Sequence, residues 1–240
     1  TFPLLTLPGA KAASAINTGQ KCSIEFDISG NSSELLSASI PVKLYKVASV
    51  DESGNYTGIG AFSKLDLSSV SADNLDAAAP TWAERAAEAK KLLKDDTEPT
   101  TTTLTQGRGT ATGLDTGLYL VDTPKVITPN YTYTFTPYLV SLPTNNYYSG
   151  NGASDDWIYN LTGSNAVGLK PEQHVRYGDL VINKELVDHN ATFGDKATFV
   201  FQIDITTLDN KKETRIEELT FDAAGSHSVT IEKIPAGSHV

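Results

Sequence analysis

The sequence predicts a mostly β protein with one amphipathic helix, and three observations support this fold class. Apolar and polar residues alternate through most of the chain, as strands with one buried face require. Clusters of Gly, Asn, Asp and Ser separate these runs and predict turns. A single run near residue 80 follows helical spacing instead. With 240 residues, 39% of them hydrophobic, the chain is long enough for one large domain or two ordinary ones.

Four alternating runs predict strands in the first part of the chain. The first contains Cys22, which alternates with Ile24 and Phe26 and is expected to be a small buried hydrophobe rather than a reactive thiol. In the last run, Tyr131, Tyr133, Phe135 and Leu139 are expected to share one face of a sheet. The runs are residues 21–28, 40–50, 117–123 and 131–142.

The helical run is PTWAERAAEAKKLLK, which predicts a helix over about residues 80–94. Trp82, Ala86 and Ala89 recur at helical spacing and form its apolar face. Pro80 suits a first turn, and lysines gather at the other end, where the helix dipole favours positive charge. We expect the helix to cover one sheet face or an open sheet edge.

The chain is expected to divide into two domains, residues 14–175 and residues 176–240. Proline and polar residues cluster at the boundary, before a new alternating run. The second domain has three clear strands, whereas a complete β-sandwich of this kind has about seven, so we expect it to be truncated. The three strands are expected at residues 179–187, 197–206 and 227–234.

Residues 1–13 have a different character from the rest of the chain. An apolar run is followed by small residues, and Ala10-Lys11-Ala12 fits the pattern of a signal-peptidase cleavage site. These residues are therefore predicted to be a signal-peptide remnant or an N-terminal tail.

Charge and motif content exclude several classes of function. The formal net charge of −10 disfavours a nucleic-acid partner and provides no basic patch for anionic lipid. No run approaches the roughly 18 apolar residues that cross a bilayer, so no membrane contact is expected from this segment. The four histidines lack metal-ligand spacing, and no metalloprotease, phosphate-loop or nucleophile-elbow motif occurs. We therefore expect no enzyme activity, no catalytic residue, no metal and no cofactor.

Lys184 is the most informative single residue. It lies in the run LVINKEL, where strand alternation places it on the same face as Leu180, Ile182 and Leu186. An ammonium in an apolar row is costly unless it is paired or neutralised. Two interpretations stay open at this point: a lysine whose amine reaches solvent at a sheet rim, or a desolvated, nucleophilic amine.

Several motifs, taken in order, resemble the N-terminal domain of the backbone (major shaft) pilins of Gram-positive sortase-assembled pili. The resemblance covers most of residues 19–171. It rests on IPVKLYKVASVDESGNYTGIGAF, the alanine-rich helix with Trp82, GLDTGLYLVDTP, YTYTFTPYLVSLP and DDWIYNL. In that family a lysine within a V-x-V-Y-P-K-like motif accepts the C-terminal threonine of the next subunit.

The resemblance implies that Lys170 is this acceptor lysine, the site of the intermolecular isopeptide bond. Val167-Gly168-Leu169-Lys170-Pro171 occupies the place of the pilin motif. The tyrosine-proline pair is missing, and the spacing from Trp157 is longer than the family pattern. An ordinary exposed linker lysine is the alternative.

The second domain resembles the Cna protein B-like domains that form an internal lysine-to-asparagine isopeptide bond. The resemblance implies that Lys184 supplies the amine, while the partner asparagine and the assisting glutamate are expected beyond residue 240. In the first domain, Lys46 alternates with Val42 and Leu44 and is the candidate for such a bond, if one exists there. The implied architecture is two tandem Ig-like, Cna protein B-like β-sandwiches.

The function that the resemblance implies is structural. The chain is expected to be a shaft subunit of a covalent pilus, extracellular and anchored to the cell wall. Its expected partners are identical subunits, joined head to tail, and a sortase. The alternative is a minor or tip pilin, or a surface adhesin, that binds a host glycan or matrix protein through loops at residues 95–110 and 143–156.

Overall fold

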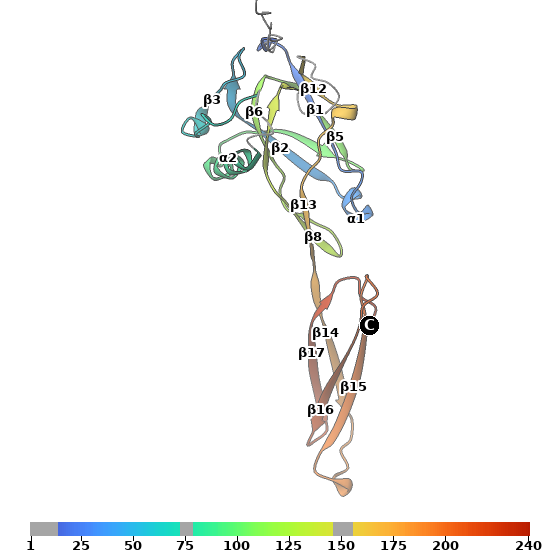
Figure 1. The fold of residues 1–240 in the computed structure, drawn as a ribbon. Coiled ribbons are helices and arrows are strands. Elements are labelled where there is room, and N and C mark those ends of the chain that lie inside the picture. Colours follow the sequence, from blue (N-terminus) through green and yellow to red (C-terminus); the bar gives the residue numbers. More distant parts are fainter. Residues whose placement is uncertain (1–13, 73–78, 146–155) are drawn as a thin grey trace, which may run out of the picture. The chain divides into compact units, whose positions relative to one another are not determined.

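The computed structural model describes residues 14–72, 79–145 and 156–240. The predicted signal-peptide remnant at residues 1–13, and most of the predicted binding loop at residues 143–156, lie outside the described residues. The chain divides into two compact units (Figure 1). Unit 1 comprises the described residues up to Val126 together with Thr134–Glu172, and unit 2 comprises Ile127–Tyr133 and Gln173–Val240. Each unit is described by itself.

Unit 1 contains two principal sheets. The larger has the order β3-β2-β6-β9 with antiparallel pairing throughout, and β4 also pairs with β2. The smaller has the order β12-β1-β5, in which β1 runs parallel to β12 and antiparallel to β5. The strands are β1 (Cys22–Asp27), β2 (Ile40–Val50), β3 (Tyr56–Gly58), β4 (Thr100–Leu104), β5 (Arg108–Leu114), β6 (Gly117–Asp122), β9 (Tyr138–Leu142) and β12 (Asn160–Leu161).

The remaining elements of the first part of the chain are short. A two-stranded sheet joins β10 (Thr144–Asn145) to β11 (Trp157–Ile158), and a further sheet has the order β13-β8-β7. The other bounds are α1 (Ser33–Leu36), η1 (Gly60–Phe62), η2 (Gly163–Asn165), β7 (Val126–Ile127), β8 (Tyr131–Phe135) and β13 (Pro171–Val175).

The strand predictions for unit 1 are confirmed with one correction. In β1 the side chains of Cys22, Ile24 and Phe26 are buried, as their alternation predicts. Burial, followed by the charge of Asp115, raises the pKa of the Cys22 thiol to about 11, as expected for an unreactive cysteine.

The correction concerns residues 131–142, which form two strands, β8 and β9, in different sheets. Pro137 lies in the break between them, and proline has no N–H to donate to a strand ladder. Leu139 therefore does not share a face with the aromatic residues of β8, contrary to the expectation.

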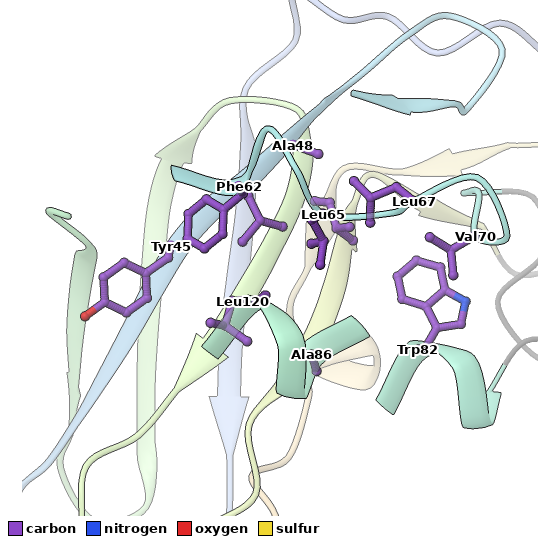
Figure 2. Close-up of a cluster of buried hydrophobic side chains, with 12 residues drawn as sticks. Tyr45, Ala48, Phe62, Leu65, Leu67, Val70, Trp82, Ala86 and Leu120 are labelled. Atoms are coloured by element: carbon purple, nitrogen blue, oxygen red, sulfur yellow. The ribbon is translucent and has the colours of Figure 1, made fainter. Parts of the chain in front are cut away.

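The predicted helix is present as α2 (Ala79–Leu92), two residues shorter at its end than expected. Trp82, Ala86 and Ala89 are buried, and Leu93 packs against the same cluster. Figure 2 shows Trp82 and Ala86 facing residues of the large sheet and of the segment that follows β3. The cluster is Tyr45, Val47, Ala48, Phe62, Leu65, Leu67, Val70, Trp82, Ala86, Ala89, Leu118 and Leu120. The helix thus covers one face of the sheet, as predicted.

Unit 2 is built around two antiparallel pairs of strands. β14 (Tyr177–Leu186) pairs with β17 (Gly225–Pro235), and β15 (Ala197–Thr206) pairs with β16 (Lys212–Phe221). A short η3 (Ala191–Phe193) precedes β15. The core of the unit is an isoleucine cluster, Ile203, Ile205, Ile231 and Ile234, with Leu180, Ile182, Phe201 and Val229 packed against it. The predicted mostly β fold class is therefore confirmed.

Candidate functional site

The segment that leads to Lys170 is fixed to the edge of β1. The N–H of Val167 donates to the carbonyl of Glu25 at 2.9 Å, and the carbonyl of Val167 accepts from the N–H of Asp27 at 2.9 Å. Phe26 and Val167 form a parallel bridge at this point. The backbone three residues before Lys170 is thus part of the small sheet.

The next three residues are fixed as well. The hydroxyl of Tyr138 donates to the carbonyl of Gly168 at 2.6 Å. Leu169 is buried. The N–H of Thr136 donates to the carbonyl of Lys170 at 3.1 Å. The backbone of the lysine is therefore held, whereas its side chain is exposed.

The amine of Lys170 lies over an aromatic ring at the rim of a groove. Its Nζ is 5.5 Å from the centroid of the Tyr138 ring, which is cation–π geometry. The groove has a volume of about 400 Å³ and lies between α2 and β9. Its lining is mostly apolar and includes Trp82, Ala83, Ala87, Leu139, Val140 and Lys170.

Tyr138 was not among the residues that the sequence singled out. Burial raises the pKa of its phenol, so the hydroxyl remains a hydrogen-bond donor across the physiological pH range. Its partner Gly168 is 30 residues away in the sequence. The run TPYLV indicates a strand residue after a proline, but nothing local to it predicts this hydrogen bond.

Lys184 lies on the half-buried face of β14, in the apolar row that its alternation predicts. Its Nζ is 4.6 Å from the centroid of the Phe199 ring on β15. The amine also donates to the carbonyl of Glu185 at 2.9 Å. The stem of the lysine thus lies on the apolar side of the strand, and the amine contacts a phenyl ring and a main-chain oxygen.

Further rings extend the contact around Lys184. Phe199 packs edge to face on Phe221, with ring centroids 5.7 Å apart. Phe221 in turn stacks on His227, with centroids 4.3 Å apart. His227 is the cross-strand partner of Lys184 in the β14–β17 pair. The lysine therefore lies beside a small aromatic group at one end of the isoleucine core.

Lys46 has a more polar environment than Lys184. It is half-buried on β2, opposite Tyr119 of β6, and its Cε lies close to Gly117. The positive charges of Lys21 and Lys46 help to lower the pKa of Asp115, whose largest shift comes from its hydrogen bond to Lys21. Lys21 pairs with that carboxylate at 2.5 Å.

The three candidate lysines lie at separate sites. Lys46 and Lys170 belong to unit 1, and Lys184 belongs to unit 2. In the parts of the chain that the structure describes, no group of three or more His, Cys, Asp or Glu side chains could hold a metal ion. None of the helices at residues 14–72, 79–145 and 156–240 is long and apolar enough to span a membrane.

Comparisons with known proteins give a similarity in structure. No protein-family model and no curated protein matches the chain. Among solved structures, the chain is similar to the full-length major pilin SpaD from Corynebacterium diphtheriae, with a TM-score of 0.35 and 20% sequence identity. The match covers 80% of this chain and 38% of the SpaD chain.

Proposed function

We propose that this chain is a structural shaft subunit of an extracellular pilus that is anchored to the cell wall, and that it is not an enzyme. Identical subunits are joined head to tail by a sortase, which links the C-terminal threonine of one copy to Lys170 of the next. The observation that carries this proposal is the fixed backbone of residues 167–170, which presents an exposed amine at the rim of an apolar groove. The order of pilin-like motifs in the sequence supports the same function.

The chemistry at Lys170 is acyl transfer. The neutral amine attacks the activated threonine carboxyl, the N–C bond forms, and the bond from the acyl carbon to the sortase breaks. The leaving group takes up the proton that the amine loses, so the exchange needs no oxidant or metal. The groove beside Lys170 has room for the residues of the second copy that precede its C-terminal threonine. An apolar, extended segment is its best occupant because α2 and β9 line it with apolar side chains.

We further propose that Lys184 forms an internal amide bond with an asparagine beyond residue 240. The lysine amine replaces the amide nitrogen of that asparagine, ammonia leaves, and a glutamate beyond residue 240 assists the proton transfer. The apolar row on β14, in which Lys184 lies, supports this role, because removal of water around an amine favours its neutral, nucleophilic form. A crosslink between strands stabilises a domain by about 2–5 kcal/mol by analogy with a disulfide.

Mass spectrometry of native filaments tests both bonds. Digestion should release a branched peptide in which Lys170 carries the C-terminal threonine of another copy. Lys170→Arg should abolish the ladder of covalent polymers, whereas Lys125→Arg, a matched change at an exposed lysine of unit 1, should leave it intact. Polymers of normal length from the Lys170→Arg variant would show that another residue is the acceptor.

Two further measurements test the internal bond at Lys184 and the alternative function of a tip adhesin. A full-length second domain should be lighter than its sequence predicts by one ammonia, and Lys184→Met should restore the full mass. Gold-labelled antibodies should mark the whole length of the fibre for a shaft subunit. Label at the tip alone would favour the alternative of a tip adhesin.

A further inference from the structure

We propose that Tyr138 is a positioning residue for the acceptor lysine, and that it acts by fixing the backbone of Gly168 and by orienting the amine of Lys170. This inference rests on the proposed function of Lys170 and deepens it. It concerns the side chain of Tyr138, which positions the Lys170 amine, rather than the amine itself. It starts from the fact that a single tyrosine contacts both the chain before Lys170 and the end of its side chain.

The first contact is made by the hydroxyl. It donates to the carbonyl of Gly168 at 2.6 Å, while the N–H of Thr136 donates to the carbonyl of Lys170 at 3.1 Å. Thr136 and Tyr138 are two residues apart, and so are Gly168 and Lys170, so one short segment holds the other at two points. Glycine gives the acceptor segment the greatest conformational freedom at the position where the tyrosine hydroxyl binds it. Loss of the hydroxyl should therefore loosen the backbone just before Lys170.

The hydroxyl of Tyr138 stays protonated, so it remains the donor of this hydrogen bond. Because burial raises the pKa of its phenol, the hydroxyl stays protonated and can only be a donor to the carbonyl of Gly168 at neutral pH. The ring belongs to β9, which pairs with β6 in the large sheet. The tyrosine is thus a rigid support on a strand rather than a mobile loop side chain.

The second contact is made by the ring. The Nζ of Lys170 lies 5.5 Å from the ring centroid, and this aromatic face restricts the rotamers of an otherwise exposed side chain. A cation–π contact favours the charged amine, so the ring does not activate the nucleophile; removal of the proton falls to the sortase. After acyl transfer, the N–H of the new amide can lie over the same ring face. The ring therefore contributes orientation before and after the reaction.

Two substitutions separate the two contacts. Tyr138→Phe keeps the ring and removes the hydrogen bond to Gly168, and Tyr138→Leu removes both contacts. Tyr45→Phe is the matched control, because Tyr45 is a buried tyrosine of unit 1 that belongs to the cluster under α2 and does not line the groove. Thermal unfolding of all variants establishes that each one is folded at the assay temperature.

The first readout requires no sortase. Reductive methylation with ¹³C-formaldehyde labels the lysine amines, and the Lys170→Arg variant identifies the Lys170 resonance. The ring current of Tyr138 should shift this resonance upfield in the native chain, in Tyr138→Phe and in Tyr45→Phe. The shift should disappear in Tyr138→Leu. An unshifted resonance in the native chain would overturn the ring contact.

The second readout is the kinetics of acylation of the chain by a pilus sortase. The acyl donor is a synthetic peptide with an LPxTG-like sorting motif, which supplies the threonine that the sortase activates. Misplacement of a bound nucleophile lowers kcat more than it changes KM. We expect kcat to fall about fivefold in Tyr138→Phe, the worth of one hydrogen bond, and by more than about tenfold in Tyr138→Leu, with KM for the chain nearly unchanged. Peptide mapping should also show acylation spreading to other lysines in Tyr138→Leu.

The outcomes distinguish this inference from the proposal on which it rests. If Lys170→Arg abolishes acylation and both Tyr138 variants react like the native chain, Tyr138 has no positioning role and Lys170 remains the acceptor. If Lys170→Arg still accepts the peptide at the native rate, the proposed function of Lys170 is wrong whatever Tyr138 does. Equal losses in Tyr138→Phe and Tyr45→Phe would indicate a general effect of altered packing and would also overturn the inference.

Discussion

Gly117 offers a sharp test of the packing that supports the groove. It is the first residue of β6, the strand that lies between β2 and β9 in the large sheet. Its φ is +155°, and a Cβ added there would lie 2.4 Å from the carbonyl oxygen of Ala48 and 2.7 Å from the Cε of Lys46. The lysine stem can rotate away, but the carbonyl belongs to the β2 backbone. Gly117→Ala should therefore destabilise unit 1.

The expected magnitude follows from two contributions. A non-glycine residue in such a backbone conformation costs about 1–3 kcal/mol, and overpacking against an immobile neighbour costs about 1–3 kcal/mol more. Ala48 is the partner of Leu118 in the β2–β6 ladder, so a shift that relieves the overlap also disturbs strand pairing. We expect a total loss of about 4 kcal/mol, a large fraction of the stability of an ordinary domain.

Gly113 supplies the matched control. Its φ is +70°, but a Cβ added there would meet no atom within 4 Å. Gly113→Ala should therefore cost only the conformational contribution, about 1–2 kcal/mol.

Urea unfolding followed by tryptophan fluorescence measures both variants. The sequence has two tryptophans, Trp82 and Trp157, and both lie in unit 1, so the signal reports the unfolding of that unit. Equal losses of unfolding free energy in the two glycine variants would refute the reasoning, because the contact with the Ala48 carbonyl would then contribute nothing.

Two further predictions concern Cys22 and Lys184. The pKa of Cys22 is raised from its ordinary value of 9.0 to about 11 in the folded chain, so between these two pH values the unfolded chain loses a proton that the folded chain keeps. Stability should therefore fall as pH rises through this window, and Cys22→Ala should make the fall shallower in urea titrations; an unchanged slope would contradict the assignment. In a chain that ends at Val240, without the proposed partner asparagine, Lys184→Met should leave the stability of unit 2 within about 1 kcal/mol or raise it, because a thioether keeps the contact with Phe199 without desolvating a charge. Circular dichroism measures this change against the exposed control Lys196→Met, and a larger loss than in that control would show that the amine itself stabilises the fold.

The parts of the fold that the sequence predicted are those with a strong local period. Cys22 to Phe26 alternate cleanly because one face of β1 is buried, and Trp82 to Ala89 follow helical spacing because one face of α2 covers a sheet. β16 was missed because charged and other polar residues occupy most of both its faces, with Ile216 largely exposed and Leu219 buried. A strand of this kind is defined by its pairing with β15, which no local period reveals.

The candidate site also has one part that the sequence predicts and one part that it does not. The inward face of Lys184 follows from strand alternation alone, so its row could be predicted. The setting of Lys170 depends on hydrogen bonds to Glu25, Thr136 and Tyr138, which are distant in the sequence. Contacts of this kind are products of the tertiary fold, and for that reason Tyr138 was not found in advance.

In the proposed function, the two lysines take two different routes to an amide bond. Lys170 has a fixed backbone and an exposed side chain, so an enzyme can approach it and deliver an activated carboxyl. Lys184 lies half-buried in the apolar row of β14, so its amine is placed for a bond within its own domain rather than for an approaching enzyme. Exposure with a rigid backbone therefore fits a bond made between subunits by a sortase. Half-burial within a sandwich fits a bond that forms once, as the domain folds.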